Sequence, residues 1–352
     1  MIPVPLFSMT LLILLAVSGL ALLALLGGLL VFGASASARA WVRRHRVRSG
    51  VLLLVLCMLS FPSAYLARSW LMVRWEIRQE QAARHPTLAA ATRIHGLDMP
   101  AGTRLSLPRG GDLQAAEEAD FPSPVPIHGV ATLSVRFSSD WDDEAPPGQL
   151  VHLPIVELSP SEVSTVEGWH CAAKAPLRLA IRSGTVVSLE GCVLAEGNQV
   201  DGIDISAGSQ LMRYTTHYGD GLKDDDRWKI KVNTSARVAQ IPLEHPSLRF
   251  DAQRKLVALN SAALSLKMTL GPMTYPAGTH VQSAGRGLRE RYPGAWLFSP
   301  VNGQEVQEKG DKPIGEGMTI VQYPDGRVEG QLPNDQAGVI IFQEITSAPD
   351  EQ

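Results

Sequence analysis

The three cysteines can form a disulfide, remain free thiols or bind a metal, and the choice depends on which side chains lie next to them in the fold. Cys171 and Cys192 lie on the two sides of a predicted hairpin that turns near residue 183. Outside the cytoplasm such a pair can form a disulfide, which would stabilise the fold by constraining the unfolded chain. Two independent thiols, or a metal site that includes His170, are the alternatives. Cys57 lies in an apolar segment and is predicted to be a small packing residue.

Clustered acids and histidines are the other groups with metal-binding chemistry. The acidic runs are DWDDE at 140–144 and DGLKDDD at 220–226, and neither has the residue order of a calcium-binding loop. We therefore predict solvated loop acids and no metal site. The nine histidines include no HxH or HxxxH pair. His95 and His128 each precede a glycine, and Asp201 takes the same place later in the chain, which predicts an exposed turn.

No sequence motif identifies an enzyme. The chain has no G-x-S-x-G elbow and no phosphate-binding loop, so we predict no catalytic residue and no cofactor. The formal net charge of -3 argues against a nucleic-acid partner, because such partners need clustered cations. An envelope hydrolase remains the alternative, since the fold rather than the sequence sets the distance between paired carboxylates.

Two apolar segments near the N-terminus precede the rest of the chain and are predicted to hold it at a membrane. Residues 4–33 contain no charged side chain and exceed the roughly 20 residues that a membrane-spanning helix needs. A signal peptide would need a basic N-terminal region, which is absent, although ASASA at 34–38 resembles a cleavage site. Residues 51–73 form the second predicted span. A polar helical linker is predicted at 74–92.

Arginines predict the orientation of this pair of helices. The basic loop at 34–50 carries no acid, and its arginines favour the cytoplasm; they are Arg39, Arg43, Arg44, Arg46 and Arg48. The expected location is the bacterial inner membrane, with both termini in the periplasm and the lipid bilayer as a partner. The opposite orientation would make the C-terminal region a cytoplasmic sensor, and four arginines at the end of the second span and just after it count in its favour; they are Arg68, Arg74, Arg78 and Arg84.

A repeated ten-residue stretch predicts the rest of the architecture. GLDMPAGTRL at 96–105 returns as GIDISAGSQL at 202–211 and as GPMTYPAGTHV at 271–281. Degenerate copies between them give a period of about 35 residues, each an alternating run, a turn and a second run, which is typical of β-hairpins. We therefore predict a mostly β domain of such repeats over 93–345, followed by a flexible tail at 346–352. Gly102, Gly208 and Gly278 should occupy left-handed turn positions.

The last copy contains TIVQYPDGRVEG at 319–330, which resembles half of a MORN-type repeat. The resemblance implies two strands joined by the Tyr-Pro-Asp-Gly turn. The period is longer than in that family, so its function is not carried over.

The predicted protein is thus a two-helix transmembrane hairpin that carries a β-repeat domain. The expected function is a non-catalytic, envelope-facing binding or protective module, such as an immunity-type protein or a scaffold, with a protein partner. This expectation rests on architecture, because folds alone do not specify functions.

Overall fold

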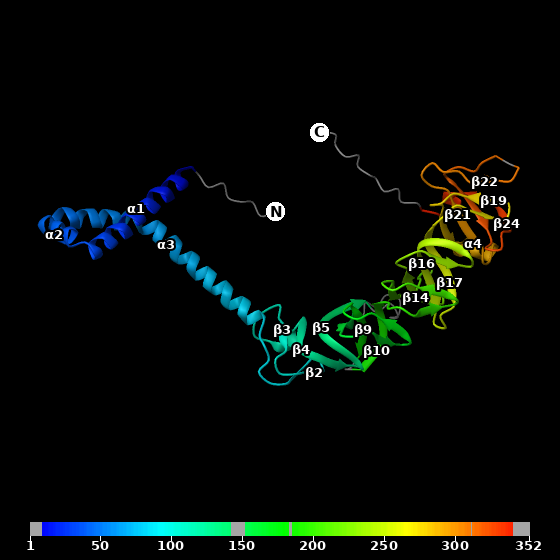
Figure 1. The fold of residues 1–352 in the computed structure, drawn as a ribbon, viewed down its shortest axis with the longest axis horizontal. Helices are drawn as coiled ribbons and strands as arrows, with labels where there is room; N and C mark the ends of the chain where they lie inside the picture. Colours follow the sequence, from blue (N-terminus) through cyan, green and yellow to red (C-terminus); the bar gives the residue numbers. More distant parts are fainter. Residues whose placement is uncertain (1–8, 142–151, 183–184, 311, 341–352) are drawn as a thin grey trace. The chain divides into compact units, whose positions relative to one another are not determined.

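The computed structural model describes residues 9–141, 152–182, 185–310 and 312–340, which divide into two compact units. The first unit is helical and ends at His85, and the second begins at Pro86 and is mostly antiparallel β-sheet. Figure 1 shows the helices in blue and the strands in cyan to red. The predicted class, long apolar helices followed by a β domain, is confirmed. The predicted tail at 346–352 lies outside the described residues.

The helical unit consists of α1 (Met9–Ala34), α2 (Ala36–Arg44) and α3 (Arg46–Arg84). Two of these helices are long and apolar enough to cross a membrane, over Ile13–Ala34 and over Arg46–Arg84. Few side chains of either segment are buried within the protein. A long helix in the core of a soluble protein would instead bury most of its apolar surface.

The structure divides two of the predicted segments differently. Residues 34–50, predicted as a loop, are mostly helical, because the Ala- and Arg-rich stretch of α2 favours helix and ends at His45. The predicted linker at 74–92 does not form one element. Its first part continues α3 to Arg84, whereas Leu88 is buried in the core of the β unit.

Small residues pack α1 against α3. Ser18, Ala21 and Ser60 are buried, as small side chains are where membrane helices approach closely. Pro62 lies inside α3 and has no N–H to donate to the helix. The adjacent backbone N–H of Ser63 donates to the hydroxyl oxygen of Ser18 at 2.9 Å. The Ser18 hydroxyl of α1 thus accepts a hydrogen bond from a backbone N–H of α3 next to the proline.

The β unit is built on one large antiparallel sheet. Its strands are β3 (Arg104–Ser106), β4 (Glu118–Ile127), β5 (Val130–Trp141), β6 (His152–Pro160), β9 (Leu177–Arg182), β10 (Thr185–Val193), β13 (Gln210–Arg213), β14 (Asp226–Lys231), β15 (Ala236–Val238), β16 (Ile241–Asp251), β17 (Leu256–Leu264), β20 (His280–Ser283), β21 (Trp296–Ser299), β23 (Met318–Gln322) and β24 (Val328–Pro333). They pair in chain order from β3 to β24, and β15 pairs with β16 beside this path. Neighbours in sequence are therefore neighbours in the sheet.

Short strands form separate hairpins. They are β1 (Thr92–Ile94) with β2 (Leu97–Met99), β7 (Ser164–Val166) with β8 (Trp169–Cys171), β11 (Asn198–Val200) with β12 (Ile203–Ile205), and β18 (Met268–Leu270) with β19 (Met273–Tyr275) and β22 (Gln307–Glu308). The unit also contains a 3-10 helix, η1 (Leu113–Ala115), and the short helices α4 (Arg286–Arg291) and α5 (Asn334–Ala337). Buried residues of the hairpins and of the main sheet belong to one hydrophobic core. The hairpins therefore cover the apolar face of the sheet.

Register aligns the apolar residues of the main sheet. One row crosses ten strands from β3 to β17, and every member is buried: Leu105, Ala119, Val135, Leu158, Leu177, Cys192, Leu211, Ile230, Leu248 and Leu259. The adjacent row presents charged side chains on the opposite face, with Glu118, Arg136, Glu157 and Arg178 in direct register. A slip of one residue would exchange the two rows, so burial of the apolar row fixes the register.

Two-residue turns recur about every 35 residues along the β unit. In each turn both central residues have positive φ, which is the type I′ geometry that matches the twist of paired strands. The first four are His95–Gly96, His128–Gly129, Glu167–Gly168 and Asp201–Gly202, and Ala239–Gln240 is the fifth. The polar residue that precedes each of the four glycines therefore lies in a turn, where several polar side chains are accepted.

The three glycines of the repeated stretch share one hydrogen-bonding pattern. Gly102, Gly208 and Gly278 have φ values of 85°, 84° and 83°. Their N–H groups donate to the carbonyls of Leu88, Leu194 and Leu264 at 2.8, 2.9 and 2.8 Å. The next residue in each case, Thr103, Ser209 or Thr279, is fully buried. Glycine is favoured here because only it adopts this φ without strain.

Replacement of Gly208 by valine should destabilise the β unit by about 1–3 kcal/mol, because a β-branched residue is strained at positive φ. A Cβ atom at this position would also lie 2.8 Å from the side-chain nitrogen of Asn233. Thermal unfolding of the full-length protein in detergent measures the loss. Gly315→Val is the control, since no atom lies within 4 Å of its Cβ position and its φ is outside the left-handed region. Equal losses in both variants would contradict the turn argument.

Candidate functional site

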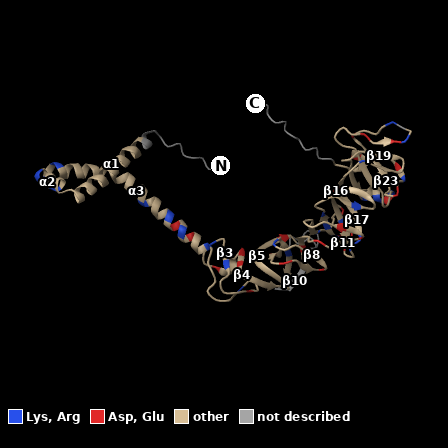
Figure 2. Ribbon diagram, viewed as in Figure 1, with Lys and Arg blue, Asp and Glu red and all other residues tan. Residues whose placement is uncertain are grey.

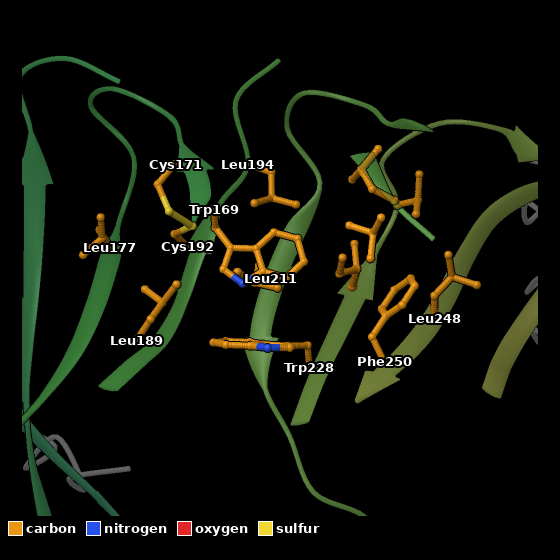
Figure 3. Close-up of a cluster of buried hydrophobic side chains, with 14 of the residues drawn as sticks. Trp169, Cys171, Leu177, Leu189, Cys192, Leu194, Leu211, Trp228, Leu248 and Phe250 are labelled. Atoms are coloured by element: carbon orange, nitrogen blue, oxygen red, sulfur yellow. A yellow bond between two sulfur atoms is a disulfide. The ribbon is translucent and has the colours of Figure 1, made fainter. Parts of the chain in front are cut away.

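A disulfide bond joins two layers of the β unit. Cys171 ends β8 and Cys192 lies on β10, with an S–S distance of 2.06 Å and a Cα–Cα distance of 5.8 Å. Both residues are buried. Figure 3 shows the bond beside Trp169, Leu177 and Leu211. Because both sulfurs are bonded to each other, they form no thiolate metal site with His170.

The position of Cys171 corrects the sequence interpretation. The hairpin near residue 183 pairs β9 with β10, and Leu177, not Cys171, lies opposite Cys192. Cys171 belongs to the separate hairpin of β7 and β8 and forms a bridge with Leu194. The turn residues 183–184 are outside the described part of the chain. The pair therefore connects a covering hairpin to the main sheet instead of closing a single hairpin.

A half-buried cluster of arginines and aspartates connects three elements of the β unit. It contains Asp224 just before β14, Asp226 as the first residue of β14, Arg249 on β16 and Arg289 on α4. One Arg249 nitrogen donates to Asp226 at 2.9 Å and to Asp224 at 3.1 Å. Arg289 donates to the other oxygen of Asp224 at 2.8 Å. We call these four residues the Arg–Asp cluster.

Two hydroxyl groups complete the Arg–Asp cluster. Thr216 donates to Asp226 at 2.6 Å through its hydroxyl and at 2.8 Å through its backbone N–H, and it accepts from Arg249. Tyr218 donates to Asp224 at 2.9 Å and accepts from Arg289 at 3.3 Å. Two positive and two negative charges are thus neutralised locally. The arrangement holds the segment between β13 and β14 against β16 and α4, and offers no free nucleophile.

This cluster corrects the prediction of solvated loop acids for Asp224 and Asp226, whereas Asp220 and Asp225 are exposed as predicted. The side chain of Asp226 has no exposed surface, and that of Asp224 is 11% exposed. The sequence contains no local signal for the pairing, because Arg249 lies 23 positions after Asp226 and Arg289 lies 65 positions after Asp224. Of the first acidic run, Asp140 lies near the end of β5, is 53% exposed and pairs with Arg178 at 2.8 Å. The acids at 142–144 are outside the described residues.

Opposing effects set the pKa of Asp224. Burial favours the neutral form, but hydrogen bonds from Arg289 and Tyr218 outweigh it, so the pKa lies below its ordinary value. Burial also raises the pKa of the Tyr218 hydroxyl, and its bond to Asp224 adds to this effect. The pair therefore consists of an ionised carboxylate and a protonated phenol at neutral pH.

Acid should destabilise the β unit through Asp224. Its folded-state pKa is lowered, so its contribution to stability is present above the unfolded-state pKa of about 4 and is lost as the pH falls below that value. Unfolding midpoints of the full-length protein between pH 3 and 7 (roughly the carboxylate range) measure this loss. Asp224→Asn should reduce the decrease in unfolding midpoint at acid pH relative to the unaltered protein. An unchanged decrease would show that other carboxylates control acid unfolding.

A cleft of about 550 Å³ lies on the first half of the sheet. Its lining includes Phe137 from β5, His152 and Val156 from β6, and His95. The His95 ring lies 4.3 Å from that of Phe137, and its Nε2 atom is 3.0 Å from the carbonyl oxygen of Ala116. The lining is predominantly apolar, which suits an aromatic or aliphatic group of a ligand.

The cleft does not carry the groups of a carboxylate-dependent hydrolase. Among the described residues, its lining contains histidines and serines but no Asp or Glu. In the Arg–Asp cluster, Asp224 and Asp226 are both paired with arginines. No group of three or more His, Cys, Asp or Glu side chains that could hold a metal occurs in the parts of the chain that the structure describes.

The five arginines of residues 34–50 separate into two groups. Arg39 donates to the carbonyl of Gly33 at 2.8 Å and so caps the C-terminal end of α1. Arg43 and Arg44 lie in the last turn of α2, and Arg46 and Arg48 lie in the first turn of α3. Figure 2 shows this concentration of basic residues at α2, in contrast to the uncharged α1.

Comparison with known proteins identifies no family for this chain: no family model, no curated protein and no solved structure matches it.

Proposed function

We propose that the protein is a two-pass protein of the bacterial inner membrane that holds a non-catalytic binding module in the periplasm, with both termini on that side. The observation that carries this proposal is the disulfide between Cys171 and Cys192 in the core of the β unit. Structural disulfides persist in oxidising compartments and are rare in the cytoplasm. The arginines between the two apolar helices support the same orientation.

We also infer that the β unit consists of degenerate β-hairpin repeats of about 35 residues. The recurring type I′ turns support this, as do the matched hydrogen bonds of Gly102, Gly208 and Gly278. Each hairpin is too small to bury its own apolar face, so neighbouring units must pack together. Such a sheet extends a binding surface one unit at a time, which suits a scaffold or a protein that captures a partner.

The cleft is the proposed contact for a protein partner. Phe137 is part of the lining, and the Trp141 ring lies against the His152 ring in a tilted arrangement with ring centroids 4.1 Å apart. An aromatic or aliphatic side chain of the partner would bury these surfaces, as anchor residues do at protein interfaces. The envelope hydrolase alternative would need an acid and a base in this same cleft, and the described lining provides no carboxylate.

Topology is tested with a reporter enzyme that is active only after export. Fusion after Gln352 should be active, and fusion after Ser49, in the first turn of α3 and before the apolar run at 51–73, should be inactive. Thiol alkylation of the unreduced protein should modify Cys57 but not the bonded pair. An active Ser49 fusion together with an inactive Gln352 fusion would reverse the orientation and support the cytoplasmic sensor.

Partner binding is tested with a photo-reactive amino acid at Ser139, in the lining of the cleft, in cells that express the full chain. The same amino acid at Leu266, which is exposed elsewhere on the β unit, is the control. A discrete cross-linked protein at Ser139 but not at Leu266, which disappears when Phe137 is replaced by alanine, would support a partner site. Equal cross-linking at both positions would contradict it.

A further inference from the structure

An apolar groove lies between the helices of the first unit at the end that carries the arginines. It has a volume of about 430 Å³. Leu25, Gly28 and Phe32 of α1 line one side, and Leu53 and Leu56 of α3 line the other. The glycine leaves space, because no atom lies within 4 Å of its Cβ position. The groove is therefore lined mainly by small and apolar residues, which suits a hydrocarbon chain.

Cations surround one end of this groove. Arg46 lines it directly together with Trp41 and Ser49. Arg43, Arg44 and Arg48 lie within the adjoining turns, and all four arginines are exposed. None of the four forms an ion pair within the residues that the structure describes, whereas Arg39 is engaged with the end of α1.

The start of α3 adds a second attraction for an anion. A helix leaves its first N–H groups without intrahelical acceptors and carries a partial positive charge at that end. The residue that precedes α3 is His45, and its side chain makes no capping hydrogen bond. Only the first turn of α3, which begins at Arg46, contributes to this effect. Arg46 and the N–H groups of this first turn can bind the same phosphate.

We propose that the helical unit binds one anionic phospholipid, with an acyl chain in the groove and the phosphate against Arg46 and the first turn of α3. The proposal rests on the membrane placement proposed above. A free phosphate would leave the apolar groove unfilled, and a zwitterionic lipid would leave the local positive charge uncompensated. A second copy of the chain would bring its own arginines against these, so like-charge repulsion disfavours it.

Lipid retention on the full-length protein tests the proposal. The protein is purified in detergent, mixed with equal amounts of phosphatidylglycerol and phosphatidylcholine, and examined by native mass spectrometry. Phosphatidylglycerol should be retained preferentially. Arg46→Gln should reduce this preference about fivefold, the effect expected for one basic residue near an anionic surface. Arg68→Gln, in the same helix but away from the groove, should leave it unchanged.

A second pair of variants tests the groove itself. Gly28→Leu should fill it and reduce retention of both lipids, whereas Gly19→Leu, also on α1 with open space at its Cβ position, should not. Glycerol phosphate in excess should not displace the lipid. Equal retention of the two lipids, equal losses in Gly28→Leu and Gly19→Leu, or displacement by glycerol phosphate would each overturn the proposal. Lipid retention does not depend on which side of the membrane the termini lie. The outcome of these measurements is therefore independent of the outcome of the reporter fusions.

Discussion

Simultaneous replacement of Cys171 and Cys192 by alanine is expected to lower the free energy of unfolding by about 3 kcal/mol. The bond closes a loop with a sequence separation of 21, and its loss gives the unfolded chain more conformational freedom. Both side chains are also buried in the core, where smaller residues leave unfilled volume. Thermal or denaturant unfolding of the full-length protein in detergent measures the change.

Two controls distinguish the bond from general damage. Cys57→Ala alters an exposed cysteine in the helical unit and should leave the β unit unchanged. Reduction of the unaltered protein should lower its stability by an amount similar to that in the double variant, because both remove the same constraint. If reduction and the double variant had no effect, the disulfide would make no contribution to the fold, and the main support for the periplasmic placement would be lost.

Replacement of Arg249 by methionine is expected to cost about 3–5 kcal/mol, the range for breaking a buried ion pair. The arginine is 12% exposed, and its two aspartate partners are 11% and 0% exposed. Its removal leaves Asp226 charged and buried, with Thr216 as its remaining hydrogen-bond partner. The same measurement of unfolding applies. The loss should be smaller at acid pH, where the Asp224 partner of Arg249 is protonated.

Arg136→Met is the matched control for Arg249. Arg136 also contacts two carboxylates, Glu118 at 3.3 Å and Glu157 at 3.4 Å, but its side chain is 57% exposed. An exposed ion pair contributes about 0–1 kcal/mol because water competes for both charges. Comparable losses in the two arginine variants would show that burial does not strengthen the Arg–Asp cluster. A double variant, Arg249→Met with Asp226→Asn, should recover part of the stability, since the orphaned charge is then absent.

Local patterns in the sequence were sufficient to predict the type of each unit. Thirty uncharged residues at 4–33 can satisfy their backbone groups in lipid only as a helix, and the structure has α1 there from Met9 onward. The Tyr-Pro-Asp-Gly stretch predicts a turn, and β23 and β24 pair across it with Gly326 at a φ of 97°. Turns and spans depend on a few adjacent residues, so their physics is visible in the sequence.

Pairings between distant residues were decided only by the tertiary structure. The short hairpin of β7 and β8 covers the main sheet, and this places Cys171 beside β10 and Trp169 against Trp228, with ring centroids 5.7 Å apart. The sequence predicted a single hairpin between the two cysteines, because it cannot show which short strands leave the sheet to cover it. Likewise, Asp224 and Asp226 resemble surface acids until α4 and β16 bring Arg289 and Arg249 to them. Burial and charge pairing depend on contacts between elements, and those contacts exist only once the sheet has assembled.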